Sequence, residues 1–139
     1  QKEFKVINLI NGYRSRGHLF TKTNPVRDRR TYRPTLSIEN FGLTNDDLNT
    51  TFNAGDIIGL GPQPLSVIIS HLEEIYCDSI GVEYMYIRTP ERIKWIQDRL
   101  NHNDNRPNFS KAQKKHILKN VFLLPRLPGK LKNIVKNIV

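Results

Sequence analysis

Apolar residues recur at helical spacing in several separate stretches of this chain, and this periodicity constrains its fold more than any other feature. In residues 3–16, apolar side chains recur at helical spacing at Phe4, Ile7, Ile10 and Tyr13, with Val6 and Leu9 beside them. Gly17 comes directly after this stretch. A glycine there can adopt the positive φ angle that commonly ends a helix, so we expect a left-handed C-cap at Gly17.

Four further helices are indicated downstream. The first is short and begins at Thr44, which can cap it, with Asp46 and Asp47 at the positive end of its dipole. A second apolar face runs through residues 64–76. Thr89-Pro90-Glu91 is a typical helix start, because threonine caps, proline suits the first helical position and glutamate meets the positive end of the helix dipole. Ser110 and Gln113 have the spacing of a capping box. Residues 82–87 alternate weakly and predict an extended segment or short strand. The sequence therefore predicts a mainly α fold with irregular loops.

The net charge of +9 is concentrated at one end of the chain. All 13 acidic residues precede position 110, and residues 1–110 contain 14 Lys and Arg, which leaves +1 there. Residues 111–139 contain the other eight basic residues and no acid. A nucleic-acid-binding domain usually carries its basic surface on the folded part. The alternative of a small basic nucleic-acid-binding module would use the arginines of residues 27–33, which otherwise form a solvated loop or a docking surface, together with the tail.

No catalytic constellation is visible in the sequence. Cys77 is the single cysteine, so an internal disulfide is excluded, and its apolar context predicts a buried, unreactive thiol. Gly59-Leu60-Gly61 lacks the third glycine of a dinucleotide fingerprint. No apolar run approaches the ~20 residues of a membrane span. The histidines have no metal-ligand spacing, and we expect His71 on the solvent side of its helix. They are His18, His71, His102 and His116.

Three stretches resemble the decarboxylase component of the 2-oxoglutarate dehydrogenase family. Residues 6–18 end in G-Y-R-S-R-G-H and resemble the family's L-I-x-A-Y-R-x-R-G-H. Residues 80–87, I-G-V-E-Y-M-Y-I, resemble I-G-x-E-Y-M-H/Y-I. Residues 95–99, W-I-Q-D-R, resemble W-I-Q-x-R. The stretches occur in family order and at family spacing, and the resemblance covers roughly residues 4–121.

The resemblance implies an amino-terminal fragment of a larger α/β thiamine-diphosphate-binding enzyme. Such a parent uses thiamine diphosphate and magnesium to decarboxylate 2-oxoglutarate in the tricarboxylic acid cycle. It passes the succinyl group to lipoyl-lysine of a succinyltransferase partner and acts as a homodimer. We expect no catalytic, cofactor-binding or metal-binding residue in this fragment, no activity of its own, and no nucleic-acid or membrane partner. A bacterial parent would be cytoplasmic, and a eukaryotic one would lie in the mitochondrial matrix.

The family motifs mark a set of residues for a structural or interface role. Arg14, Arg16 and His18 either form a charged scaffold near a domain or subunit junction or simply cap the helix. Glu83 and Tyr84 either contribute to such a junction or pack in a buried extended segment. The whole set is Tyr13, Arg14, Arg16, Gly17, His18, Glu83, Tyr84, Met85 and Trp95.

The chain departs from the family pattern in two places. Near residue 122 the family leads toward K-R-F-S-L-E-G, whereas this chain continues as L-L-P-R-L-P, as a truncated or frame-shifted sequence would. We therefore expect a helical region over residues 1–121 and an off-family basic tail over residues 122–139, outside any packed domain. Some animal members carry a second histidine after R-G-H and paired acids linked to calcium. Leu19 and the arginines of residues 27–33 occupy those places here, so we expect no calcium site.

Overall fold

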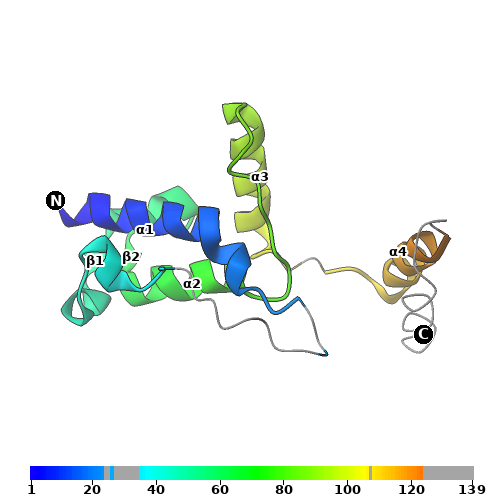
Figure 1. The fold of residues 1–139 in the computed structure, drawn as a ribbon, viewed down its shortest axis with the longest axis horizontal. Coiled ribbons are helices and arrows are strands. Elements are labelled where there is room, and N and C mark those ends of the chain that lie inside the picture. Colours follow the sequence, from blue (N-terminus) through cyan, green and yellow to red (C-terminus); the bar gives the residue numbers. More distant parts are fainter. Residues whose placement is uncertain (24–25, 27–34, 107, 124–139) are drawn as a thin grey trace. The chain divides into compact units, whose positions relative to one another are not determined.

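The computed structural model describes residues 1–23, 26, 35–106 and 108–123, with the side chains of residues 122 and 123 left out (Figure 1). The chain divides into two compact units, Gln1–Arg106 and Pro107–Val139, which are described separately below. The arginines of residues 27–33 and the tail beyond residue 123 lie outside the described residues. The predictions that fall on them therefore stay predictions.

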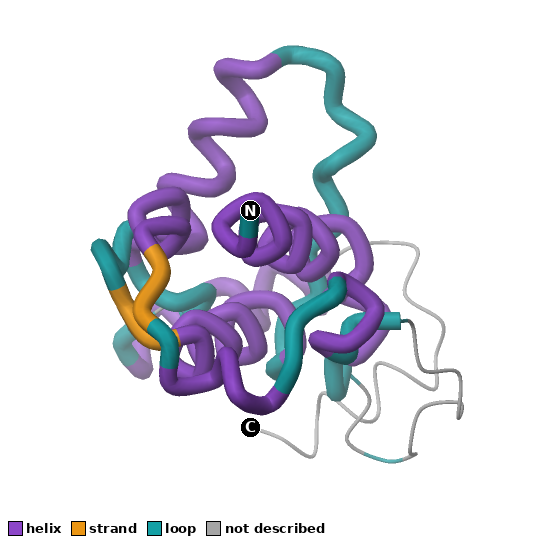
Figure 2. Tube along the Cα trace, turned by 90° about the vertical axis from the view of Figure 1, so that its left-hand side faces the viewer, coloured by secondary structure: helices purple, strands orange, loops and turns teal. Residues whose placement is uncertain are grey.

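The first unit is built mainly from helices, as the sequence predicts (Figure 2). Its one pairing of strands among the described residues is antiparallel, with Thr51 opposite Pro64 and Phe52 opposite Gln63. The α-helices are α1 (Lys2–Arg16), α2 (Leu65–Cys77) and α3 (Pro90–His102), the strands are β1 (Thr51–Phe52) and β2 (Gln63–Pro64), and the short 3₁₀ helices are η1 (Gly17–Phe20), η2 (Ile38–Phe41), η3 (Asn45–Asn49) and η4 (Asn53–Ile58).

The core of the first unit forms where α1 packs along α2 (Figure 1). Its fully buried side chains include Val6, Leu9 and Ile10 from α1 and Leu65, Ile68, Leu72 and Ile75 from α2. Each such side chain contributes roughly 1.5–3 kcal/mol by leaving water. The predicted apolar face of α1 is buried at Val6, Leu9, Ile10 and Tyr13, whereas Phe4, which the prediction also placed on it, is 73% exposed.

Polar contacts fix the amino-terminal end of α1. The Glu3 carboxylate accepts the backbone N–H groups of Asn53, at 2.9 Å, and Ala54, at 3.1 Å, at the start of η4. The Lys2 ammonium lies 2.6 Å from Asp47 Oδ1 and lowers the pKa of that carboxyl. Since Asp47 also accepts the backbone N–H of Thr44, at 3.0 Å, these contacts tie α1 to both η3 and η4.

The predicted left-handed cap at Gly17 is wrong. Gly17 has φ −58° and ψ −37°, which are right-handed helical values, and the chain continues directly into η1. The glycine is required by close approach to α2: a Cβ built on Gly17 would lie 2.6 Å from the Cβ of Tyr76. Sequence position alone does not distinguish a glycine chosen for its φ angle from one chosen for its missing side chain.

The prediction of a strand in residues 82–87 is also wrong. The segment contains no strand, and a turn forms at Met85 and Tyr86. The Ile87 N–H donates to the Tyr84 carbonyl at 3.0 Å. The alternation of the sequence arises because Tyr84 is buried in the core, with Val82 and Ile87 partly buried against it, while Glu83 and Met85 stay exposed.

The predicted helix at Thr89-Pro90-Glu91 is confirmed as α3, and the chain then returns to the end of α2. The Asn105 side-chain amide donates to the carbonyls of Ile75, at 2.9 Å, and Ile80, at 3.1 Å. Arg106 lies 2.6 Å from Glu74 and 3.2 Å from Asp78. Residues 105 and 106 therefore close the first unit on the carboxyl end of α2.

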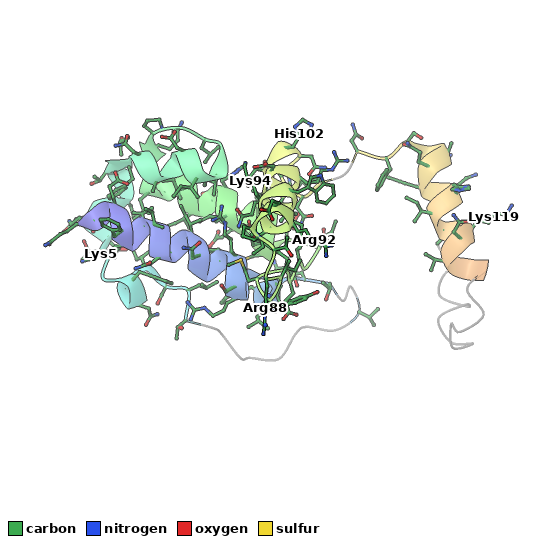
Figure 3. All side chains as sticks on the ribbon, turned by 90° about the horizontal axis from the view of Figure 1, so that it is seen from above. Lys5, Arg88, Arg92, Lys94, His102 and Lys119 are labelled. Atoms are coloured by element: carbon green, nitrogen blue, oxygen red, sulfur yellow. The ribbon has the colours of Figure 1, made fainter. Side chains whose placement is uncertain are left out.

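The second unit contains α4 (Lys111–Leu123). The predicted capping box is confirmed, because the Ser110 N–H donates to Gln113 Oε1 at 2.8 Å and the Gln113 N–H donates to Ser110 Oγ at 3.3 Å. The basic side chains of α4 are exposed, among them Lys119 (Figure 3). In the part of the chain that the structure describes, no helix is long and apolar enough to cross a membrane.

Replacement of Gly17 by alanine should destabilise the first unit by about 1–3 kcal/mol, because the added methyl group collides with Tyr76. Urea unfolding followed by circular dichroism measures the change. Ser15→Ala, on the exposed surface of the same helix, is the control and should alter the unfolding free energy by less than about 0.5 kcal/mol. Equal stabilities of the Gly17→Ala and Ser15→Ala variants would contradict the close approach.

Candidate functional site

The first family motif lies where the carboxyl end of α1 meets the carboxyl end of α2. Tyr13 is buried there, and its hydroxyl lies 3.5 Å from Glu73 Oε1. Burial, and then the neighbouring Glu73 carboxylate, raise the pKa of Tyr13 above its ordinary value. A cavity of about 720 Å³ opens beside it. The cavity is lined by Tyr13, Phe20, Lys22, Thr35, Leu36, Ser37, Asn40, Glu73, Glu74, Cys77, Asp78 and Arg106.

The chemistry of this cavity is that of a packed junction. Arg106 is paired with Glu74 and Asp78, so its charge is balanced within the lining. The Cys77 thiol is half-buried, and burial raises its pKa to about 12. A thiol held in its protonated form is a poor nucleophile, which agrees with the unreactive cysteine predicted from the sequence.

Arg14 is a buried cation and is only 6% exposed. Its guanidinium donates to the Ile57 carbonyl at 3.2 Å and to Asn11 Oδ1 at 3.4 Å. The hydrogen bond to Ile57 joins the last turn of α1 to the end of η4. The burial makes Arg14 a structural tie inside the unit, whereas the sequence left helix capping and a charged junction equally open.

Arg16 has a different environment from Arg14. It is half-buried, donates to Thr35 Oγ1 at 3.1 Å, and its guanidinium carbon lies 5.9 Å from the centre of the Phe41 ring. It therefore holds η2 and the residues before it against α1. The two arginines of one motif thus contact different parts of the unit.

The first two family motifs meet at His18 and Glu83. His18 Nε2 lies 3.9 Å from Glu83 Oε2, and the Glu83 side chain is largely exposed. At this distance the contact is an ion pair only when the imidazole is protonated. Gly81 packs against the same turn, because a Cβ built there would lie 3.7 Å from the Cβ of His18.

Tyr84 anchors the second motif in the core. Its hydroxyl lies 3.1 Å from that of Tyr76, and both side chains are fully buried. Burial, followed by the neighbouring Tyr76, raises the pKa of Tyr84 above its ordinary value. The sequence motif marked Tyr84, but nothing in the spacing of the sequence indicated that Tyr76 would be its partner.

Met85 and Trp95 lie on the surface of the first unit, and Trp95 is 68% exposed. A hollow of about 290 Å³ on the outer side of α3 is lined by Trp95, Asp98, Arg99 and His102. The structure therefore separates the motif residues into buried anchors and exposed side chains. The motif alone does not make this distinction.

The sequence suggested that His71 lies on the solvent side of α2, and this prediction is wrong. Its side chain is 14% exposed, and Nδ1 lies 3.7 Å from Asp104 Oδ1. The turn at residues 103–106 covers it, and a contact with residues more than thirty positions away cannot be read from helical periodicity. Among residues 1–23, 26, 35–106 and 108–123, no three His, Cys, Asp or Glu side chains are grouped so that they could hold a metal ion.

Comparison with known proteins gives the family. The chain is 39% identical over 120 residues to the 2-oxoglutarate dehydrogenase E1 component of Azotobacter vinelandii, a match of 85% of this chain and 13% of that protein. This chain belongs to the 2-oxoglutarate dehydrogenase E1 family. A multifunctional 2-oxoglutarate metabolism enzyme of Mycolicibacterium vanbaalenii is 38% identical over 120 residues, 84% of this chain and 10% of the relative. No family model matches the chain.

The chain thus spans about a tenth of the length of these two curated relatives. This share is consistent with an amino-terminal part of an E1 component. The resemblance inferred from the three motifs is confirmed at the level of the family. The roles of the individual motif residues stay predictions, which the geometry above makes specific.

The free energy of unfolding should fall as the pH rises above about 10, the ordinary tyrosine pKa. Below that pH both states keep their phenolic protons. Above it the unfolded state releases them while folded Tyr13 and Tyr84 retain theirs, so stability falls by about 1.4 kcal/mol per pH unit for each retained proton. Urea unfolding at several pH values measures this, and the Tyr13→Phe, Tyr84→Phe double variant should weaken the dependence, leaving the part that comes from the raised pKa of Cys77. Tyr86→Phe removes an exposed hydroxyl and is the control.

Arg14→Lys should destabilise the first unit by about 2 kcal/mol, because lysine cannot reach both Ile57 and Asn11 and leaves a buried charge with fewer hydrogen bonds. Arg16→Lys should cost no more than about 1 kcal/mol, since its contact with Phe41 is partly solvated. Thermal and urea unfolding of the two variants compares them. A larger loss at Arg16 than at Arg14 would contradict the assignment of Arg14 as the buried tie.

Proposed function

We propose that this chain is the helical amino-terminal part of a 2-oxoglutarate dehydrogenase E1 component and serves as a structural module for the cofactor-bearing body of that enzyme. The observation that carries the proposal is the match to E1 components over 85% of the chain but only 13% of the relative. In this proposal the module comprises residues 1–121.

The activity belongs to the parent enzyme. In this proposal the parent decarboxylates 2-oxoglutarate with thiamine diphosphate and magnesium, works as a homodimer, and transfers the succinyl group to the lipoyl-lysine of a succinyltransferase partner. Both relatives named above are bacterial, which favours the cytoplasm over the mitochondrial matrix.

The residues that the structure describes do not fit the cofactor. Magnesium bound to a diphosphate takes oxygen ligands in an octahedral arrangement, with carboxylates among them. Within the described ranges no group of three potential ligands exists, and the acids of the cavity are engaged by Tyr13 and Arg106. No step of decarboxylation is therefore assigned to a residue of this chain.

The motif residues support a structural role. Tyr13, Arg14 and Tyr84 are buried and tie α1, η4 and α2 together, and Gly17 allows α1 to approach α2. These contacts fix α1, η4 and α2 relative to one another and offer no reacting group. The alternative of a nucleic-acid-binding module has no support among the named relatives, which are all enzymes of 2-oxoglutarate metabolism.

A chimeric enzyme tests the proposal. Residues 1–121 of this chain would replace the matching region of the Azotobacter vinelandii E1 component. We expect the chimera to keep decarboxylase activity within about tenfold of the parent. Imperfect packing of the exchanged region against the body is the main reason for any loss of turnover. The measurement is thiamine-diphosphate-dependent turnover of 2-oxoglutarate.

Two controls accompany the chimera. The isolated 139-residue chain should neither turn over 2-oxoglutarate nor bind thiamine diphosphate with magnesium in a calorimetric titration. The Azotobacter vinelandii enzyme without its matching region should lose activity, because its body would expose the surface that the module covers. Cofactor binding by the isolated chain would refute the structural-module proposal, and so would a truncated enzyme whose activity is undiminished.

A further inference from the structure

The outer face of α3 carries an unusual surface. Trp95, Asp98, Arg99 and His102 follow the i, i+3, i+4, i+7 spacing of one helical face and line the hollow of about 290 Å³. Trp95 is 68% exposed at this hollow. Tryptophan is highly buried on average, so a side chain exposed to this extent is an apolar surface without a described partner.

This face is separate from the side of α3 that packs on the core. Leu100 is buried, and Ile93 and Ile96 are partly buried against the core of the first unit. Those side chains attach α3 to the core, and Trp95 is not among the side chains packed against it. The exposure of Trp95 is therefore not explained by the packing of the first unit.

The charges of the face are partly unbalanced. Lys94 pairs with Asp98 at 2.8 Å along the helix. Within the described part of the chain, Arg92 and Arg99 take part in no ion pair. Figure 3 shows Arg92, Lys94 and His102 projecting from α3. Tryptophan and arginine are the residues that most often dominate the energy of a protein interface.

We propose that this α3 face, defined by Trp95, Asp98, Arg99 and His102, is the surface on which the module docks to the remaining body of the E1 component. Trp95 inserts into an apolar pocket of the body, and Arg99 meets a carboxylate at its edge. The inference rests on the proposed function, and it adds the surface and the chemistry of its partner.

The length of the relatives identifies the occupant. The matched region is only 13% of the Azotobacter vinelandii E1 component, so most of such an enzyme lies outside the region described here. A helical unit attached to a body of that size offers it a large contact surface. Trp95 also lies in the W-I-Q-D-R stretch that matches the family, which places the exposed tryptophan within the shared region.

The first test uses the fact that Trp95 is the single tryptophan of the chain. The 139-residue chain is labelled with 5-fluorotryptophan and mixed with the unlabelled Azotobacter vinelandii E1 component that lacks its matching region. We expect the fluorine resonance to shift and to lose its solvent-isotope effect as Trp95 becomes buried. Calorimetry with unlabelled variants should show at least tenfold weaker binding for Trp95→Ala.

Phe4→Ala is the matched control, because Phe4 is an aromatic side chain of similar exposure on α1. Its affinity should stay within twofold of the unchanged chain. Binding with an unaltered fluorine resonance, or equal losses for Trp95→Ala and Phe4→Ala, would overturn the α3 face and leave the proposed function standing. A resonance that shifts with the concentration of the chain alone would assign the face to a second copy and also overturn the inference.

The active chimera provides the second test, which does not require the truncated body to fold. Hydrogen exchange of residues 90–102 is compared between the chimera and the isolated chain. We expect slower exchange in the chimera, and equal exchange in an active chimera would refute docking through α3. An inactive chimera together with absent binding would instead count against the proposed function, so the two failures are distinguishable.

Discussion

The first unit depends on the close contact between the carboxyl ends of α1 and α2. The missing side chain of Gly17 allows α1 to reach the Cβ of Tyr76. This contact brings Tyr13 beside Glu73, Cys77 into the cavity wall and His18 toward Glu83. Because protein interiors are close-packed, one added methyl group at this point would displace several of these neighbours together.

The opposite end of α1 is fixed by charge instead of shape. Glu3 accepts two backbone N–H groups at the start of η4, and Lys2 pairs with the buried Asp47. Hydrogen bonds to a carboxylate are stronger than those between neutral groups, so these contacts set where the 3₁₀ helices lie along α1. A helix held at both ends gives the motif residues between them fixed positions.

The sequence predicted the α-helices well because their signals are local. The apolar periodicity of residues 3–16, the capping box at Ser110 and the proline start of α3 each operate within one or two turns. The family was also recognisable, since ordered motifs require no knowledge of contacts. The errors arose at Gly17, His71 and residues 82–87, where the outcome depends on a neighbour distant in sequence.

The candidate residues illustrate the same limit. Arg14 and Arg16 share a motif and a helix, yet their different burial follows from Ile57 on one side and Thr35 on the other. Tyr84 and Met85 are adjacent, yet one enters the core and the other faces water. A pattern identifies such positions as a group, and only the folded chain assigns each of them a partner.

The turn at Asn105 and Arg106 has a consequence for how this gene can change. All buried side chains of the described chain precede residue 107, and none of residues 108–121 is buried. Substitutions at residues 108–121 therefore remove no side chain from the hydrophobic interior of the first unit. Changes in that part of the coding sequence should have little effect on the folding stability of the first unit, and selection for stability alone would not oppose them.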